Sequence, residues 1–327
     1  MILAILHETG ATLEDLLKGL PDPQPAAIER MIFAEQVDDA LVIHFRYAAF
    51  DASYTLPRAT LDQYEAVIKK LRDGLSQLAT ADQRQSEAIK TDAVAKAFLE
   101  AIKIWPDANP SDLWYFLVYR AYCDPYNHPA LYSRLDFSQS WRRTGGWALE
   151  EIVVRHYGPY LKTKGINIFI ADGASKQQLV KAMEIEDRVE ADKIDVVLTG
   201  DTKSGPKFFG VVHVKASFAE RRTDDVPLSI ALAKAGYTSP LWTMDCKSTP
   251  SAEPINRGEL GDADGKRSAK RKEIEDEAYF TGCFSYNSNT RPSPAGLSPE
   301  RRVHICDFKN PDDAFSKFIV KRWHEHR

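Results

Sequence analysis

Residues 193–217 read KIDVVLTGDTKSGPKFFGVVHVKAS. Apolar and β-branched residues fill both ends of this stretch, and DTKSGPK between them has the Gly, Pro and Ser of a turn, so the stretch predicts two strands joined by a turn. Alternation along the second strand places four side chains on one face, those of Phe209, Val211, His213 and Lys215. Asp195 lies in the apolar run of the first strand. A half-buried ammonium needs a partner, so Asp195 is the nearest acidic candidate for Lys215, unless both side chains end in water.

Helices and strands alternate on both sides of this hairpin. GWALEEIVVRHYGPYL (146–161) has the apolar spacing of an amphipathic helix, and GINIFIAD (165–172) is typical of a strand. A short helix around 178–185 precedes the hairpin, whereas VPLSIALAKAGY (226–237) predicts a helix and PLWTMDCKS (240–248) a strand after it. The order α, β, β, β, α, β predicts an α/β core in which helices flank a mixed sheet.

The N-terminal part of the chain has a different, mainly helical pattern. DLWYFLVYRAY (112–122) predicts a buried helix, and LVIHFRYAAF (41–50) is the one strand expected there. The proline-containing stretch CDPYNHPALYSR (123–134) is typical of a connector. We therefore expect a mainly helical domain at 1–137 and a second domain at 138–327.

Composition excludes several classes of protein. The chain has 327 residues with 43 Lys and Arg against 47 Asp and Glu, a formal charge of −4, which argues against coating nucleic acid through net charge but leaves a local basic face open. Four cysteines without a CxxC pair indicate neither a zinc ribbon nor a disulfide scaffold, which fits a reducing cytoplasm. The opening run MILAIL is too short for a signal peptide, and the chain lacks the roughly 18–20 apolar residues of a membrane span.

The predicted core resembles the PD-(D/E)xK nuclease superfamily. The resemblance lies in the element order, with the acid Asp195 on the second strand and Lys215 on the third. It implies that acidic side chains bind Mg²⁺ beside the scissile phosphate, while the lysine positions or activates water. Hard oxygen ligands suit Mg²⁺, which lowers the pKa of bound water, and a nearby cation offsets charge in the transition state. The chain departs from the family pattern at His213, where an acid normally stands.

The first helix of the core supplies a further acidic candidate. Glu150 and Glu151 lie there in the sequence LEEIV, and the spacing of Glu150 fits the family pattern better. The resemblance thus implies Glu150 and Asp195 as metal ligands, with Lys215 as the catalytic cation and His213 beside it.

Within the superfamily, residues 140–250 resemble the BsaWI-like type II restriction endonucleases of the CCGG-recognising group. That group also has a non-acidic residue two positions before the lysine, followed by an acid–Arg pair, here Glu220 and Arg221 with Arg222 next. These three residues are implied to read bases, because Arg bonds bidentately to guanine and a carboxylate accepts from cytosine. The group's further acid falls at Ser229 in this chain. Either Asp224 or Asp225 replaces it from a shifted position, or Glu150 suffices.

The leading hypothesis is a bacterial, cytoplasmic, Mg²⁺-dependent type II restriction endonuclease that cleaves duplex DNA at a palindrome containing CCGG. A two-fold symmetric site implies a homodimer, and no membrane partner is expected. One alternative is a repair or structure-specific nuclease of the same superfamily. Another is a DNA-binding protein that has lost catalysis, which the histidine at position 213 favours.

Three features leave alternatives open. Asp245 and Lys247 match D-x-K more literally than His213 and Lys215 do. They fall on the predicted fourth strand, however, where the superfamily does not keep its lysine, so we favour the interpretation that they form the polar end of a core strand. The segment GKRSAKRKEIEDE (265–277) could contact phosphates or form a self-paired, solvated helix. The N-terminal domain could clamp DNA, form the dimer interface, or lock the catalytic domains until DNA binds.

Overall fold

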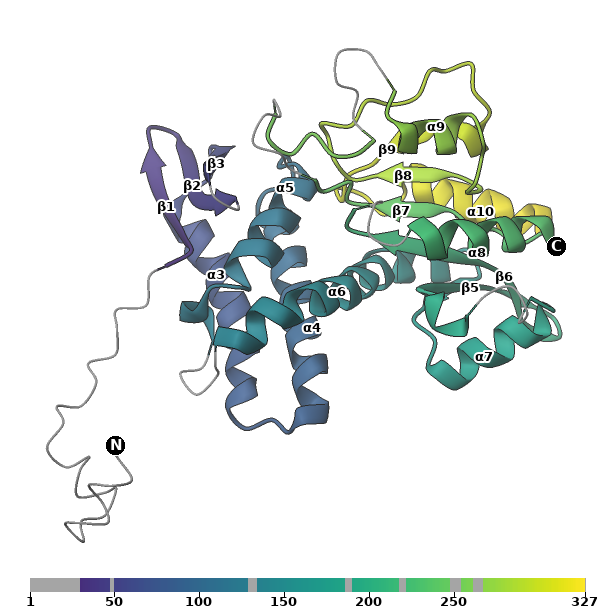
Figure 1. Ribbon diagram of the computed structural model, residues 1–327, viewed down its shortest axis with the longest axis horizontal. Coiled ribbons are helices and arrows are strands. Elements are labelled where there is room, and N and C mark those ends of the chain that lie inside the picture. The colour runs from purple at the N-terminus through teal and green to yellow at the C-terminus, as the bar shows by residue number, and fades with distance from the viewer. Residues whose placement is uncertain are drawn as a thin grey trace, which may run out of the picture. The chain divides into compact units, whose positions relative to one another are not determined.

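The computed structural model describes residues 30–47, 50–128, 134–185, 190–217, 222–247, 254–260 and 267–326. All of them except residue 30 belong to the unit Met31–Arg327 (Figure 1).

A three-stranded antiparallel sheet opens this unit. It consists of β1 (Ile32–Val37), β2 (Ala40–Tyr47) and β3 (Phe50–Pro57) in that spatial order. The sequence predicted one strand in this region, at 41–50, so two of the three strands were missed. β1 escaped prediction because only its first residue is buried and most of the others are exposed, which gives no clean alternation of polar and apolar residues.

Helices form most of the chain between β3 and residue 128, as the sequence predicted. They are α3 (Leu61–Ser76), α4 (Gln83–Ile104), α5 (Pro110–Trp114) and a π-helical turn at Tyr115–Ala121. The two long helices begin with capping boxes at Thr60 and Asp82. In each, the capping side chain accepts a hydrogen bond from a backbone amide of the first turn, and the side chain of a glutamine accepts one from the backbone amide of the capping residue. Short 3₁₀ turns lie at Gln77–Ala79, Pro125–Asn127, Ala191–Lys193 and Pro299–Arg301.

A six-stranded mixed sheet forms the second half of the unit, which confirms the predicted fold class. Its strands lie in chain order: β4 (Ile166–Phe169), β5 (Val196–Thr202), β6 (Gly205–Lys215), β7 (Leu241–Thr243), β8 (Cys283–Ser285) and β9 (Val303–Ile305). β4, β5 and β6 pair antiparallel, and β6 to β9 pair parallel. The helices of this half are α6 (Arg134–Lys162), α7 (Gly173–Ala182), α8 (Arg222–Lys234), α9 (Ala269–Glu275) and α10 (Ala314–His326) (Figure 1).

Helices cover both faces of this sheet. One face packs against α6 and α10, with Val212 of β6 and Trp323 of α10 in the same buried cluster. The other face packs against α7 and α8, where Val211 of β6 meets Leu228 of α8. Both faces are therefore apolar, so polar groups gather where the central strands end.

The predicted alternation along β6 holds only in part. Val211 faces α8, but Phe209 lies on the opposite face, against Trp323. A register shift between Leu198 and Thr199 of the paired strand, opposite this part of β6, interrupts the alternation. The placement of Phe209 on the face of His213 and Lys215 was therefore wrong.

α6 runs through residue 137, where the sequence suggested a domain boundary. The division into 1–137 and 138–327 consequently remains a prediction. None of the helices in the described residues combines the length and the apolar content that crossing a bilayer requires.

Candidate active site

Lys215 and Asp195 meet where β5 begins and β6 ends. Asp195 lies one residue before β5, and Lys215 is the last residue of β6. Oδ2 of Asp195 accepts a hydrogen bond from Nζ of Lys215 at 2.6 Å and another from the backbone amide of Val214 at 2.9 Å. Both charged side chains are at least nine-tenths buried. The predicted pairing of Asp195 with Lys215 is thus present, and the alternative that both end in water is wrong.

Asp225 brings a second carboxylate to the same lysine from the first turn of α8. Its Oδ1 lies 3.3 Å from Nζ of Lys215 and 3.6 Å from Nδ1 of His213. Burial alone would raise the pKa of Asp225, but the neighbouring His213 and Lys215 outweigh it and hold that pKa below its usual value. Asp225 is therefore a carboxylate at neutral pH.

The charge of Lys215 is stabilised by the acids around it. Burial would lower the pKa of the ammonium, whereas Asp195 and Asp225 raise it, and Glu150 adds a smaller contribution of the same sign. Lys215 therefore carries its proton at neutral pH. Glu150, on α6, acts on this site by its charge, whereas the neighbouring Glu151 instead pairs with Arg155 at 3.0 Å.

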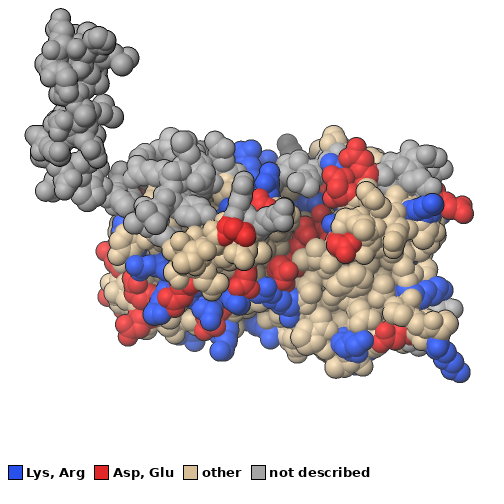
Figure 2. All heavy atoms as spheres, turned by 90° about the horizontal axis from the view of Figure 1, so that it is seen from below, with Lys and Arg blue, Asp and Glu red and all other residues tan. Residues whose placement is uncertain are grey.

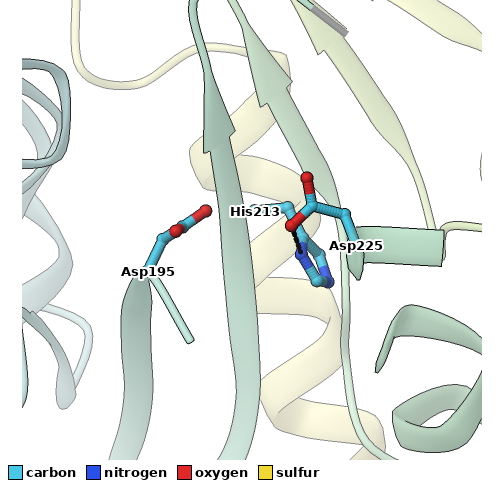
Figure 3. Close-up of side chains that lie close together, drawn as sticks. All are labelled: Asp195, His213 and Asp225. Carbon is cyan, nitrogen blue, oxygen red and sulfur yellow. Dashed lines mark ion pairs between the residues drawn. The ribbon is translucent and has the colours of Figure 1, made fainter. Parts of the chain in front are cut away.

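One group of side chains in the described residues could hold a metal ion. Asp195, His213 and Asp225 each offer one ligand atom, and these atoms lie within 4.8 Å of one another. Figure 3 shows the carboxylate of Asp225 turned toward the His213 ring, with Asp195 at the start of the neighbouring strand. Two anionic oxygens in a buried position are a donor set that fits a divalent cation.

His213 has a partner that the sequence did not indicate. Its Nε2 lies 2.8 Å from Oγ of Ser239, whose own amide donates to Oγ1 of Thr281 at 2.8 Å. Ser239 is fully buried just before β7. It follows His213 by 26 residues, and no pattern of spacing relates two residues that meet only across parallel strands.

The residues expected to read bases are not all described. Glu220 and Arg221 lie outside the described residues, in the connection from β6 to α8. Arg222 and Asp224 belong to α8, but their side chains are not among those described. Ser229, at the position of the group's further acid, donates to the carbonyl of Ser239.

The literal D-x-K sequence forms a separate, structural cluster. Asp245 lies beyond the end of β7 and is fully buried, and its carboxylate accepts from the amides of Glu259 and Leu260 and from the Thr290 hydroxyl. Lys247 instead pairs with Glu259 at 2.6 Å. The two side chains therefore hold the 254–260 segment in place.

The basic segment forms ion pairs within its own neighbourhood. Arg271 is buried and pairs with Glu275 at 2.8 Å, Arg267 pairs with Asp276 at 2.6 Å, and Lys270 pairs with Glu259. Lys266 lies outside the described residues. These ion pairs favour the self-paired interpretation for Arg267, Lys270 and Arg271, whereas Lys272 is exposed on α9.

These features together form the core of a PD-(D/E)xK nuclease. The core is a strand-turn-strand unit packed against α6, with an acid before its first strand and a buried lysine at the end of its second strand. A second acid reaches this lysine from α8, and His213 takes the place of the acid two residues before it.

Comparisons with known proteins agree with this class. No protein-family profile matches the chain. The type II restriction enzyme AgeI of Thalassovita gelatinovora is 38% identical over 239 residues, which span 70% of this chain and 83% of that enzyme. The crystal structure of the specific AgeI–DNA complex superposes with a TM-score of 0.73 at 32% identity, covering 86% of this chain and 99% of that one. The pre-specific BsaWI–DNA complex gives a TM-score of 0.42 at 15% identity, covering 80% and 93%. The chain belongs to the type II restriction enzyme family that includes AgeI.

Proposed function

We propose that this protein cleaves both strands of duplex DNA at a palindromic sequence that contains CCGG, and that the reaction needs Mg²⁺. The observation that supports this most strongly is the buried cluster of Asp195, Lys215 and Asp225, in which one ammonium lies within 3.3 Å of both carboxylates. The DNA in the crystal structure of the related AgeI complex supports the choice of substrate.

Asp195 and Asp225 are the proposed metal ligands, with Glu150 near enough to act on the same charges. Mg²⁺, when bound, polarises the phosphate and lowers the pKa of its water. Asp225 comes from α8 and so supplies, from a shifted position, the acid that neither His213 nor Ser229 can provide.

Lys215 has two proposed roles in the reaction. Its ammonium, held by Asp195, orients the attacking water beside the scissile phosphate. The same positive charge offsets the negative charge that grows on the phosphate oxygens in the transition state. Because Lys215 is almost completely buried, this charge acts in a medium of low dielectric constant and is only weakly screened.

Base reading is assigned to Glu220, Arg221 and Arg222. They lie in the chain between Lys215 and Asp225, and Arg222 is the first residue of α8. An acid next to two arginines has the donors and acceptors that G·C pairs require in the major groove. Acidic and basic side chains are interspersed on the face shown in Figure 2, so we expect contact with DNA to depend on local side chains rather than on net charge.

The proposed oligomeric state follows from the two-fold symmetry of the DNA sequence. A palindrome is read most economically by a homodimer, in which each protomer cuts one strand. We assign residues 1–137 to DNA clamping or dimerisation and 138–327 to catalysis. The enzyme works in the bacterial cytoplasm, whose reducing conditions suit the four free cysteines.

Digestion of a sequenced plasmid with Mg²⁺, followed by sequencing of the ends, tests the proposal. Wild-type protein is expected to give discrete fragments whose ends share one CCGG-containing palindrome, and Asp195→Asn, of nearly the same shape, to give none. A smear of fragments would favour a repair or structure-specific nuclease. Specific binding without any product would favour a catalytically inactive DNA-binding protein.

A further inference from the structure

We propose that His213 is itself a metal ligand, through Nδ1, so that the site binds Mn²⁺ and Co²⁺ with a preference over Mg²⁺ that two carboxylates alone would not give. This inference rests on the proposed function, because it concerns the metal centre formed by Asp195 and Asp225.

The first argument is an unused buried nitrogen. The His213 side chain is fully buried, and its Nδ1 has no hydrogen-bond partner among the described residues. It points at the carboxylate of Asp225, with 3.6 Å between Nδ1 and Oδ1 (Figure 3). A buried polar atom without a partner is costly, and a cation between nitrogen and carboxylate would satisfy both.

The other ring nitrogen has the partner that a ligating histidine needs. Nε2 lies 2.8 Å from Oγ of Ser239. Without metal, a proton on Nδ1 faces Asp225 and lowers the pKa of that carboxyl. With metal bound, a neutral imidazole that donates from Nε2 to the serine oxygen has its lone pair on Nδ1, on the side of the carboxylates. Metal-binding histidines almost always use their second nitrogen in this way, which fixes the tautomer and the ring orientation. Phe280 packs edge-on against the ring at 5.3 Å between centroids and holds it further.

The distances allow a shared cation. Two ligands of one metal, each about 2.1 Å from it, lie about 3 Å apart at right angles and about 4.2 Å apart when opposite. The 3.6 Å between His213 and Asp225 falls inside this range, and Asp195 offers its oxygen within 4.8 Å of both ligand atoms. Any pair of ligand atoms as far apart as the 4.8 Å limit has to draw together before the two atoms can share a cation.

The identity of the ligand determines the metal preference. An acid at position 213 would add an anionic oxygen, the donor that suits Mg²⁺. Imidazole adds a neutral nitrogen instead, which suits the first-row transition metals, and affinity then rises from Mn²⁺ to Co²⁺. A histidine at this position therefore keeps the centre functional while changing the cation that it prefers.

Pulsed electron paramagnetic resonance of Mn²⁺ bound to the full-length protein tests this directly. We expect electron spin echo modulation from a coordinated imidazole ¹⁴N in wild type, and a ¹⁵N pattern after labelling with ¹⁵N-histidine. His213→Gln should lose this signal and bind Mn²⁺ roughly tenfold or more weakly, with less than threefold change for Mg²⁺ measured by competition. His156→Gln, which removes another histidine outside the site, should keep the signal.

Two results would overturn the inference. One is Mn²⁺ that binds to wild type without any nitrogen modulation, and the other is modulation that persists in His213→Gln. Asp195→Asn separates this inference from the proposed function. If that variant binds Mn²⁺ and cleaves DNA as wild type does, the whole site is misassigned. If it loses both while wild type shows no nitrogen signal, only the role of His213 is wrong.

Discussion

Nζ of Lys215 lies 2.6 Å from Oδ2 of Asp195, and the same oxygen accepts the backbone amide of Val214. The hairpin formed by β5 and β6 creates this contact, because its pairing brings residues 20 positions apart to the same end of the sheet. A buried pair of this kind contributes little net stability, since removing two charges from water costs nearly as much as their attraction returns. Its position beside Asp225 and His213, in a nuclease core, is better explained by catalysis.

The first prediction concerns stability at this pair. Lys215→Met leaves Asp195 and Asp225 buried without their cation, so the variant should lose roughly 3–5 kcal/mol of unfolding free energy in the absence of metal. Mg²⁺ should then raise the melting temperature of the variant more than that of wild type, because it replaces the missing charge. Denaturant and thermal unfolding with and without Mg²⁺ measure both effects. An equal response to Mg²⁺ in the two proteins would speak against a metal at these carboxylates.

The second prediction separates Asp225 from Ser229 as the replacement acid. Asp225→Asn removes a proposed metal ligand and should slow cleavage roughly 100-fold or more, with DNA binding retained. Ser229→Ala removes one hydrogen bond to a backbone carbonyl and should leave the rate within a few-fold of wild type. Single-turnover cleavage and binding assays compare the two. Similar rates for both variants would remove Asp225 from the catalytic set.

The third prediction uses the pH dependence of stability at Asp245. Burial raises the pKa of this carboxyl from 3.8 to about 7, although Thr290 and the amide of Glu259 act to lower it. The folded protein therefore keeps the proton at pH values where the unfolded chain has lost it, so this contribution to stability is greatest at low pH and falls as pH rises from about 4 to 7.

Asp245→Asn should remove this dependence. Relative to wild type, the variant should gain up to about 4 kcal/mol between pH 4 and pH 8, at about 1.4 kcal/mol for each unit of pKa shift. Its cleavage rate should stay near that of wild type, because Asp245 holds the 254–260 segment rather than the reacting groups. If the unfolding free energies of wild type and Asp245→Asn change with pH in parallel, the Asp245 carboxyl is ionised in the folded protein and the prediction is wrong.

The fourth prediction tests the close approach of β6 to the segment before β7. A Cβ added at Gly210 would overlap the carbonyl oxygen of Thr238, which is a backbone atom and cannot move aside cheaply. Gly210→Ala should therefore cost more than about 2 kcal/mol of unfolding free energy. Gly296→Ala is the matched control, because nothing lies within 4 Å of its added Cβ. Equal stability of the two variants in urea would contradict the packing described at this strand.

Local patterns were enough to predict the core around the hairpin. The apolar spacing of 146–161 and the paired runs around DTKSGPK identified α6, β5 and β6, and with the two strands Asp195 and Lys215, whereas Glu150 was implied by the resemblance to the superfamily. The six-stranded sheet could not be derived in full, because β8 and β9 are three residues long and carry no measurable period.

The remaining features depend on contacts between distant segments. The choice between Asp224 and Asp225 depends on how α8 approaches the end of β6, and Ser239 meets His213 only across the sheet. The bulge that turns Phe209 to the other face is equally invisible in an alternating sequence.

Single-turnover cleavage by Lys215→Ala tests the central claim most directly. The substrate is the duplex palindrome found for wild type, with Mg²⁺ present and enough protein to saturate it. We predict a rate at least about 10³-fold below that of wild type, with binding of the same duplex little changed and Lys247→Ala as an active control. Cleavage by Lys215→Ala at the wild-type rate would contradict the assignment of Lys215 and Asp195 to the reacting phosphate.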